Sequence, residues 1–454
     1  MSGGNGDTGD RAKGVLGEYR DASQRMALEA PAAVRWIART LEAEGFETWA
    51  VGGAVRDALL GHPSGDWDLA TRARPEDMVR IFKRTVPIGI DHGTVGVLAR
   101  DGQMYEVTTF RHDVETDGRH AVVSFADRIE DDLARRDFTI NAIAWHPGSE
   151  HLLDPFGGRR DLASRVLRTV GDPAERFRED HLRVLRAFRF AGRFGLRVET
   201  GTWTALRSVT EELRHLSAER IRDELLKVLE ADPCPSTALE LYRTSGALAV
   251  LYPELAMLTG SHEVGTSTSP WDRACATVDA LPRGRPILRL AGLLSGMEPE
   301  RVAAVLIRLR LSNQQVERVS RVASAPHLPP SDAPDADFRR WLSRTGRDFW
   351  NGAVRVQLAR ARAGNQEGAA RHTRPAELLE AWRRARRVRD QEPPLEVGDL
   401  ALDGRSLIAL GLKPGPRFGA ILDDLLEWVL EDPERNREER LVERVLASGG
   451  GHGA

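Results

Sequence analysis

The sequence contains few of the features that mark exported or membrane proteins. It has only two cysteines, Cys234 and Cys275, which are too few for a disulfide framework or a cysteine-based metal site. No apolar stretch is long enough to span a bilayer, and the first residues, MSGGNGDTGDRAKG, lack the apolar core of a signal peptide. We therefore expect a soluble, cytoplasmic protein with no membrane partner.

Lysine is also scarce, and the chain has no excess of positive charge. Its 454 residues include 4 lysines and 61 arginines, and the formal net charge is −3. A strongly basic balance is the usual footprint of a general nucleic-acid-binding domain, so charge alone does not favour that class. Arginine suits bidentate phosphate contacts, although genomic base composition explains most of the bias.

The most informative stretch is residues 51–71, VGGAVRDALLGHPSGDWDLAT. It predicts a strand end, a glycine pair, a short helix, a polar turn and a second strand. Gly52 and Gly53 lack a Cβ, so a phosphate can approach their N–H groups closely. Asp66 and Asp68 are two residues apart, and on a strand their carboxylates would share one face. This combination indicates a Mg²⁺ site for phosphoryl chemistry, the alternative being a glycine-rich turn with two solvated aspartates.

Three further stretches follow in order along the chain. They are RRDFTINA at residues 135–142, EDHLR at 179–183 and SAERIRDELLK at 217–227. Together with GG-x-VRD-x-LLG and D-x-D-x-x-T in residues 51–71, they resemble the class II tRNA nucleotidyltransferases (CCA-adding enzymes) and the bacterial poly(A) polymerases. The resemblance is strong over roughly residues 35–260 and weaker beyond.

This resemblance implies a catalytic site of three carboxylates. Asp66 and Asp68 are expected to bind two Mg²⁺ ions, and Glu106 to be the third carboxylate. Glu106 lies in the second arm of a hairpin predicted over residues 93–110, because β-branched residues flank the Asp101-Gly102 turn. An exposed strand glutamate with no catalytic role is the alternative.

The same resemblance assigns a set of nucleotide-binding residues. The triphosphate would be held near the glycine pair, and Asp137 can accept a hydrogen bond from a ribose hydroxyl. The motif RRDFTINA is expected to begin a helix with Phe138 and Ile140 turned inward. The full set is Gly52, Gly53, Arg56, Arg135, Arg136, Asp137, Asn141, Asp180, Arg183 and Arg186.

Base selection is expected on a helix predicted over residues 172–195. Asp180 and Arg183 are three residues apart, so they would be neighbours on one helix face. In the family this pair recognises the pairing edge of the incoming base, so the protein itself would select C or A. An ordinary surface ion pair has the same spacing. A polar segment at residues 112–127 resembles the loop that switches nucleotide choice, and we expect it to be mobile.

We expect an α+β fold, with a polymerase-β-like nucleotidyltransferase head built on a small mixed sheet and an all-helical neck, body and tail. The predicted boundaries are a disordered segment over 1–29, the head over 30–150, the neck with its base-recognition helix over 151–258, the body over 259–330 and a tRNA-binding tail over 331–447. The body resembles an HD phosphohydrolase-like region. It has Ser295-Gly296 where a metal-binding His-Asp pair would stand, so we interpret it as a scaffold without hydrolase activity.

Two stretches of the tail are candidates for binding RNA phosphates. The basic segment ELLEAWRRARRVRD contains Arg384 and Arg387, and a solvated helix face is the alternative. The Gly/Pro turn at residues 411–416 contains Lys413 and Gly415, and a plain helix–turn–helix is the alternative.

The predicted reaction is the template-independent transfer of C and A nucleotides from CTP and ATP to the 3′ end of tRNA, without an obligate protein partner. Three alternatives remain open. Two are a poly(A) polymerase and an enzyme that adds only C or only A. The third is a catalytically inactive RNA-binding protein, which the paired carboxylates disfavour because a pure binder needs no metal ligands.

Overall fold

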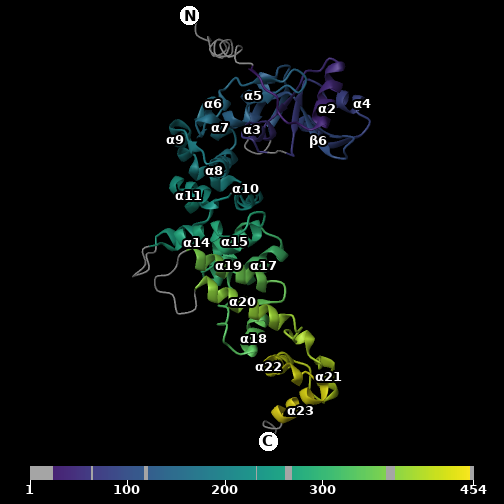
Figure 1. Cartoon of the computed structure of the whole chain (residues 1–454), viewed down its shortest axis with the longest axis vertical. Coiled ribbons are helices and arrows are strands. Elements are labelled where there is room, and N and C mark those ends of the chain that lie inside the picture. The colour runs from purple at the N-terminus through teal and green to yellow at the C-terminus, as the bar shows by residue number, and fades with distance from the viewer. Residues whose placement is uncertain are drawn as a thin grey trace, which may run out of the picture. The chain divides into compact units, whose positions relative to one another are not determined.

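A computed structural model describes residues 24–62, 65–116, 121–231, 233–260, 268–363 and 374–449. The chain forms two compact units (Figure 1), Met1–Leu216 with Thr244–Val250, and Ser217–Arg243 with Leu251–Ala454. Within the described ranges, no helix is long and apolar enough to cross a membrane.

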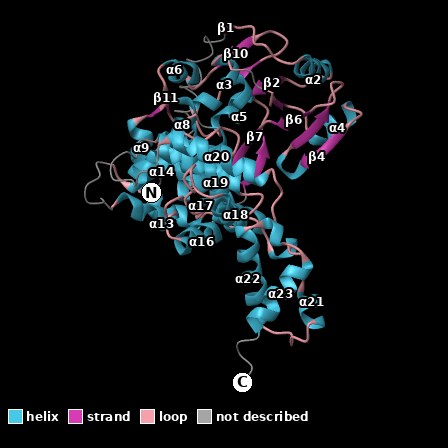
Figure 2. Ribbon diagram, turned by 60° about the horizontal axis from the view of Figure 1, so that its bottom comes forward, coloured by secondary structure: helices cyan, strands magenta, loops and turns pink. Residues whose placement is uncertain are grey.

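The first unit is built on a mixed sheet, whose strands are drawn in magenta in Figure 2. Among the described residues this sheet has eight strands. Their spatial order is β1 (Gln24–Arg25), β10 (His151–Leu153), β9 (Ala144–Trp145), β2 (Thr48–Val51), β3 (Asp68–Thr71), β6 (Met104–Thr109), β5 (Thr94–Leu98) and β4 (Thr85–Gly89). β3 runs parallel to β6, and the other neighbours are antiparallel. The predicted α+β head with a mixed sheet is confirmed.

One face of the sheet is buried along β5 and β6. Side chains of this face alternate along β5 and β6, and they are Val95, Val97, Tyr105 and Val107. Helices α2 (Ala32–Ala43) and α4 (Pro75–Ile81) pack against the sheet, α2 on β2 and β3 and α4 on β5. Helix α2 turns an apolar stripe inward, as its 3.6-residue period predicts. It is followed by Gly45 at a φ of 87°, where glycine is favoured.

The other face is covered only in part. Over β2, β3 and β9 it packs against helix α5 (Ile129–Ala134), in an apolar cluster that includes Val51, Ala70 and Leu133. Over β4 and the start of β6 the face is exposed to solvent, at Val86, Met104 and Glu106. The boundary between the covered and the exposed part is where the candidate site lies.

The prediction that residues 1–29 are disordered is wrong for residues 24–29. β1 pairs with β10, the Met26 amide donates to the Glu150 carbonyl at 2.9 Å, and the Trp145 indole donates to the Met26 carbonyl at 2.8 Å. Leu28 is buried. The rest of that prediction concerns residues outside the described ranges. The sequence of this short edge strand gives no local signal, because its partner lies more than a hundred residues away.

The predicted helix over residues 172–195 is two helices, α7 (Pro173–Glu179) and α8 (Leu182–Phe194). Both predicted ends are confirmed, since Asp172 caps α7 and Gly195 ends α8 in the left-handed region. The break occurs at Asp180, whose backbone is extended and whose carboxylate accepts from the Leu182 amide at 3.0 Å. An aspartate that caps the next helix competes with continuation of the previous one.

Two local predictions in the head also need correction. The motif RRDFTINA forms only a 3₁₀ turn at Thr139–Asn141, although Phe138 and Ile140 are buried as predicted. The segment 112–127 is not a loop throughout, because β7 (Arg111–Thr116) pairs antiparallel with β8 (Ala121–Phe125). Residues 117–120 between them lie outside the described ranges.

The remaining elements of the first unit connect the sheet to α7 and α8. They are α3 (Gly53–Leu59), α6 (Gly158–Ala163), β11 (Val166–Leu167), β12 (Arg197–Val198), α9 (Thr200–Ser208) and α12 (Ala247–Leu251). Helix α11 (Pro235–Ser245) and helix α12 each contain residues of both units. β11 and β12 pair in parallel.

The described residues of the second unit are helical, as predicted for the body and tail. The prediction of an all-helical neck over residues 151–258 is wrong at its start, because β10 belongs to the sheet of the head and β11 pairs with β12. Its elements are α10 (Ala218–Ala231), α13 (Pro253–Ala256), α14 (Pro270–Asp279), α15 (Pro286–Leu294), α16 (Pro299–Arg308), α17 (Asn313–Ala323), α18 (Asp335–Thr345), α19 (Trp350–Arg362), α20 (Pro375–Arg389), α21 (Gly404–Ala409), α22 (Arg417–Glu431) and α23 (Glu438–Gly449). One apolar core joins α18, α19 and α20, and another joins α21, α22 and α23. Ser295 follows α15, and its hydroxyl donates to the Gly292 carbonyl.

Replacing Gly158 by alanine is expected to destabilise the first unit by at least about 2 kcal/mol. The added Cβ would lie 2.1 Å from the Thr139 carbonyl oxygen, which the 3₁₀ turn holds in place. The shift in urea unfolding measures the loss. Gly65→Ala is the control, since its Cβ would meet nothing within 4 Å. Equal unfolding midpoints for the two variants would contradict the packing argument.

Candidate active site

The glycine pair lies where the candidate residues converge. Gly52 has a φ of 75° and a ψ of −134°, which a residue with a side chain rarely adopts. A Cβ on Gly52 would be 3.1 Å from Nη1 of Arg136 and 3.9 Å from Oδ2 of Asp68. A Cβ on Gly53 would be 3.6 Å from Nη2 of Arg56. The structure therefore brings the side chains of Arg56, Asp68 and Arg136 close to the Gly52-Gly53 turn.

Asp68 lies beside this turn, and the charges of two further carboxylates, Asp66 and Glu106, act on it. Asp68 is the first residue of β3, while Asp66 is exposed and precedes the strand, contrary to the prediction that both are on it. Leu69 pairs with Val107 in parallel register, so Asp68 and Glu106 occupy neighbouring positions on one face of the sheet. The charges of Asp66 and Glu106 both act on Asp68.

Negative charge is in excess around Asp68. Burial, followed by the charges of Asp66 and Glu106, raises the pKa of Asp68 from 3.8 to about 6, and Arg136 offsets part of the rise. A bound cation favours ionised carboxylates and would lower this pKa again.

The donor set fits magnesium bound together with a substrate. Within the described ranges, no three His, Cys, Asp or Glu side chains form a ready metal site. Mg²⁺ is commonly held by one or two carboxylates plus substrate phosphates and water, rather than by an all-protein cage. Asp66 and Asp68 beside the glycine turn provide that kind of partial set.

A buried acid that the sequence reasoning missed orients two arginines. Asp132 on α5 accepts from Arg135 at 2.8 and 3.0 Å and from Arg136 at 3.0 Å. Burial by itself raises the pKa of Asp132, but the two guanidinium groups outweigh it and hold the pKa below its usual value. The sequence did contain a signal for these ion pairs, because Asp132 precedes Arg135 by three residues and Arg136 by four.

Asp137 links the 3₁₀ turn to α8. Its carboxylate accepts from the Phe138 amide at 2.9 Å, from Asn141 at 3.0 Å and from Arg186 at 2.7 Å. Burial raises the pKa of Asp137, and Arg186 and the other donors more than compensate, so the pKa is lowered. These donors already form hydrogen bonds to the carboxylate of Asp137. The expected contact of this carboxylate with a ribose hydroxyl stays a prediction.

Arg56 supports the glycine turn from inside the protein. It is almost fully buried, bonds Asn141, pairs with Asp57 at 2.7 Å and stacks on Phe194 with its guanidinium carbon 4.4 Å from the ring centre. Burial lowers its pKa, although Asp57 opposes that effect. Its contact with the triphosphate also stays a prediction.

The two residues expected to read the base lie at the junction of α7 and α8. Arg183 pairs with Glu179 and donates to the Arg176 carbonyl at 2.9 Å and to the Arg135 carbonyl at 3.5 Å. The side chain of Arg183 is therefore beside the RRDFTINA motif, although more than forty residues separate them in sequence.

The four RNA-binding candidates differ in exposure. Arg384 is half-buried, where it joins α20 to Asp335 at 3.0 Å and to the Ser331 carbonyl at 2.8 Å. Arg387, Lys413 and Gly415 are exposed. A cavity of about 540 Å³ lies beside Arg387, and its lining residues are Ser331, Glu380, Arg383, Arg384, Arg386 and Arg387. Arg384 therefore has a structural role that the sequence did not indicate.

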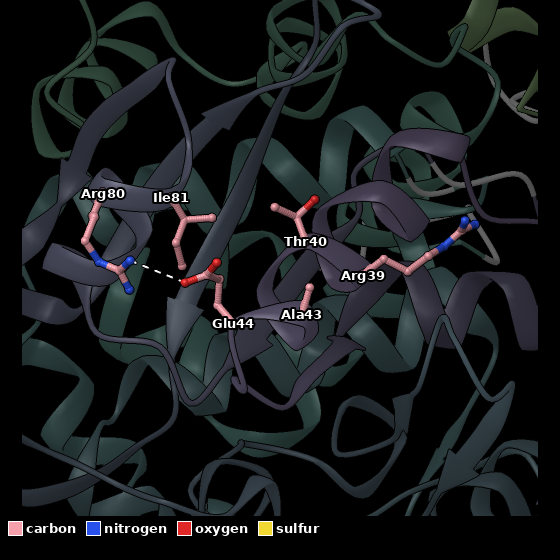
Figure 3. A pocket seen from close by; sticks show the side chains of 6 residues that line it. All are labelled: Arg39, Thr40, Ala43, Glu44, Arg80 and Ile81. Carbon is pink, nitrogen blue, oxygen red and sulfur yellow. Dashed lines mark hydrogen bonds and ion pairs between the residues drawn. The ribbon is translucent and has the colours of Figure 1, made fainter.

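Another cavity, of about 530 Å³, lies between α2 and α4. Figure 3 shows Arg80 paired with Glu44 at its wall, with Thr40 and Arg39 from α2. These helices cover the opposite face of the sheet from Asp68 and Glu106. This hollow is therefore separate from the candidate active site.

Comparison with known proteins identifies the family of the chain. Residues 48–168 match the family model described as "Poly A polymerase head domain", and residues 195–258 match "Probable RNA and SrmB- binding site of polymerase A". The CCA-adding enzyme of Levilactobacillus brevis is 34% identical over 421 residues, which cover 90% of this chain and 96% of that protein.

This chain belongs to the family of CCA-adding enzymes.

Other members of the family are more identical to this chain over about half of its length. The CCA-adding enzyme of Anoxybacillus flavithermus is 47% identical over 222 residues, which cover 48% of this chain and 55% of that protein. The crystal structure of the Bacillus stearothermophilus CCA-adding enzyme in complex with CTP has a TM-score of 0.71 at 32% identity, covering 92% of this chain and 98% of the other. The fold predicted from the sequence is that of the family.

Replacing Asp68 by asparagine is expected to stabilise the metal-free chain near pH 7.5 by about 1–3 kcal/mol. The folded state raises the pKa of Asp68 to about 6, so ionising Asp68 costs folding free energy above that pH. Below its ordinary pKa of 3.8 the group is protonated in both states, and the gain disappears. Urea unfolding with a chelator at about pH 7.5 and about pH 4 measures both effects.

Asp127→Asn provides the matched control, because that side chain is highly exposed in the same unit. A stability gain from Asp68→Asn that does not change with pH would contradict the electrostatic assignment.

Proposed function

We propose that this chain adds C and A nucleotides from CTP and ATP to the 3′ end of tRNA without a template. The observation that carries the proposal is that Asp68, on which the charges of Asp66 and Glu106 act, lies beside the Gly52-Gly53 turn together with Arg136. Membership of the CCA-adding enzyme family over 90% of the chain, and the CTP bound to the Bacillus stearothermophilus relative, support it.

In this proposal Asp66 and Asp68 bind two Mg²⁺ ions, with Glu106 as a further carboxylate beside them. Magnesium bound there supplies a Lewis acid, which lowers the pKa of the attacking hydroxyl and neutralises charge on the departing pyrophosphate. The surplus negative charge around Asp68 supports this role, because it is unfavourable without a cation.

The triphosphate binds against Gly52 and Gly53, where the missing side chains leave the backbone accessible. Arg136 reaches this turn and is oriented by Asp132, so its guanidinium faces the phosphates at little cost in side-chain entropy. The RNA 3′ oxygen forms a bond to the α-phosphorus, the bond to the β-phosphate bridging oxygen breaks, and pyrophosphate leaves.

Base selection falls to the junction of α7 and α8. Asp180 offers acceptors and Arg183 offers donors, which suits the pairing edges of C and A. Arg135 lies against Arg183 and Arg186 is held by Asp137, so the pair is attached to the catalytic motif. In the second unit, the exposed Arg387, Lys413 and Gly415 are proposed contacts for tRNA phosphates, and Arg384 holds α20 beneath them.

One assay distinguishes the rival activities. Purified chain and Mg²⁺ are incubated with labelled tRNA lacking CCA, or ending in C or CC, together with CTP, ATP or both, and the products are sized on a gel. Addition of two C and one A is the expected result. Addition of C only or A only indicates a divided pathway, a long ladder with ATP indicates a poly(A) polymerase, and no extension of any RNA indicates a binding protein.

Asp66→Ala is expected to lower kcat by at least about 10³-fold, because it removes a metal ligand worth several kcal/mol in the transition state. Its affinity for tRNA should stay within about twofold. Single-turnover extension and filter binding measure the two effects. Asp127→Ala is the control, and turnover of Asp66→Ala at the rate of that control would refute the metal assignment.

Arg183→Ala is expected to reduce the preference for CTP over UTP by about 10- to 100-fold, since a hydrogen bond from a charged donor contributes about 1.5–3 kcal/mol. The ratio of kcat/KM values for the two nucleotides measures it. Arg178→Ala, an exposed arginine of α7, is the matched control. A lower overall rate with an unchanged ratio would assign Arg183 to the fold rather than to base selection.

A further inference from the structure

An exposed apolar platform lies on the sheet beside the catalytic carboxylates. Its side chains are Val86 and Ile88 on β4 and Met104 on β6, with exposed fractions of 43%, 41% and 49%. Large apolar side chains grouped on a surface mark a site where another molecule binds.

The platform shares a face with Glu106. Gly96 on β5 pairs with Glu106 on one side and with Val86 on the other, and paired residues point to the same face. A Cβ on Gly96 would lie 2.7 Å from Cδ1 of Ile88 and 2.8 Å from Sδ of Met104. The missing side chain therefore allows Ile88 and Met104 to close over the strand into one continuous surface.

The strand order places this platform on one side of the carboxylates and the triphosphate turn on the other. The sequence of strands is β2, β3, β6, β5, β4. The Gly52-Gly53 turn follows β2, Asp68 and Glu106 lie on β3 and β6, and the platform extends from Met104 on β6 across β5 to Val86 and Ile88 on β4. In an in-line displacement the attacking hydroxyl and the leaving pyrophosphate lie on opposite sides of the α-phosphate. The 3′ end of the RNA must then approach from the platform side.

The charges around the platform suit a nucleic-acid strand. Lys83 and Arg84 precede β4, and Arg100 follows β5, so all three exposed cations lie at the same end of this antiparallel pair. Within the described ranges, none of them forms an ion pair, and the nearby Asp101 accepts from the Tyr105 hydroxyl at 2.8 Å. Phosphates of an RNA strand would find unpaired cations there.

The edge itself is poorly suited to pairing with another copy of the chain. Pro87 lies in the middle of β4 and has no N–H to donate, and the register shifts between Pro87 and Gly89. Proline and bulges are devices that block strand addition. The exposed side chains, rather than the backbone of the edge, are therefore the surface available for binding.

We propose that the platform formed by Val86, Ile88 and Met104 binds the last nucleotides of the acceptor RNA strand. Flat base faces pack on the aliphatic and thioether side chains, and the adjoining phosphates face Lys83, Arg84 and Arg100. This inference rests on the proposed function, because it assigns the position of the RNA that the reaction extends. It gives the chain a contact with the primer end that does not depend on the base being added.

The test uses the full chain carrying Ile88→Ser together with Met104→Ser. With RNA ending in CC and saturating ATP, the KM for RNA is expected to rise at least about fivefold, since the two serines remove apolar surface that the bases would bury. The Kd for CTP measured without RNA should not change. Val79→Ser is the matched control, because Val79 is 50% exposed but lies on α4 at the other face.

A second variant, Val86→Glu, places a negative charge on the same surface without removing the other two side chains. It should raise the KM for RNA, and the rise should shrink at high salt. Unchanged KM values for RNA in the folded variants would overturn the proposal. The proposal would also be overturned if the wild-type chain sedimented as a dimer and a variant as a monomer with a normal KM for RNA. That result would show that the platform binds a second copy of the chain. A wild-type chain that extends no RNA would instead refute the proposed function.

Discussion

The repulsion among carboxylates that the fold holds on one sheet face is the constraint on which the site depends. Burial raises the pKa of Asp68 most, the charges of Asp66 and Glu106 raise it further, and Arg136 offsets only part of the rise. Such groups stay close because the parallel pairing of β3 with β6 and the apolar cluster around Val51 fix the backbone beneath them. In the proposed function, bound Mg²⁺ ions offset this excess of negative charge, so metal binding completes a site that the folded chain alone leaves electrostatically unfavourable.

Two buried acids near the site, Asp132 and Asp137, accept hydrogen bonds from arginines and so orient them. Asp132 fixes Arg135 and Arg136, and Asp137 fixes Arg186, each through several short hydrogen bonds. The arginines are partly exposed while the acids are not, so each guanidinium group is oriented before a ligand arrives. The entropy of ordering these long side chains is thereby lost during folding rather than during nucleotide binding, which favours a precise geometry in the transition state.

The features that the sequence predicted are local ones. The glycine pair, the hairpin over β5 and β6, the Asp172 cap and the Gly195 end depend on neighbours within a few residues. The misses depend on distant partners. β1 needs β10, Arg384 is engaged by Asp335 from another helix, and the apolar platform depends on Gly96 lying between two strands. The break at Asp180 was also missed. The sequence spacing of this aspartate is the same whether it continues the first helix or accepts a hydrogen bond at the start of the second.

In the proposed function, nucleotide and RNA meet at the carboxylates on one face of the sheet, the nucleotide from the β2 side and the RNA from the β5 side. A structure of the chain with Mg²⁺, a non-hydrolysable CTP analogue and an RNA lacking its last nucleotides tests it most directly. We predict triphosphate oxygens at Gly52 and Gly53, metal between Asp66 and Asp68, and the 3′-hydroxyl on the β5 side of Glu106. A triphosphate bound away from the glycine turn, or an RNA end approaching from β2, would contradict it.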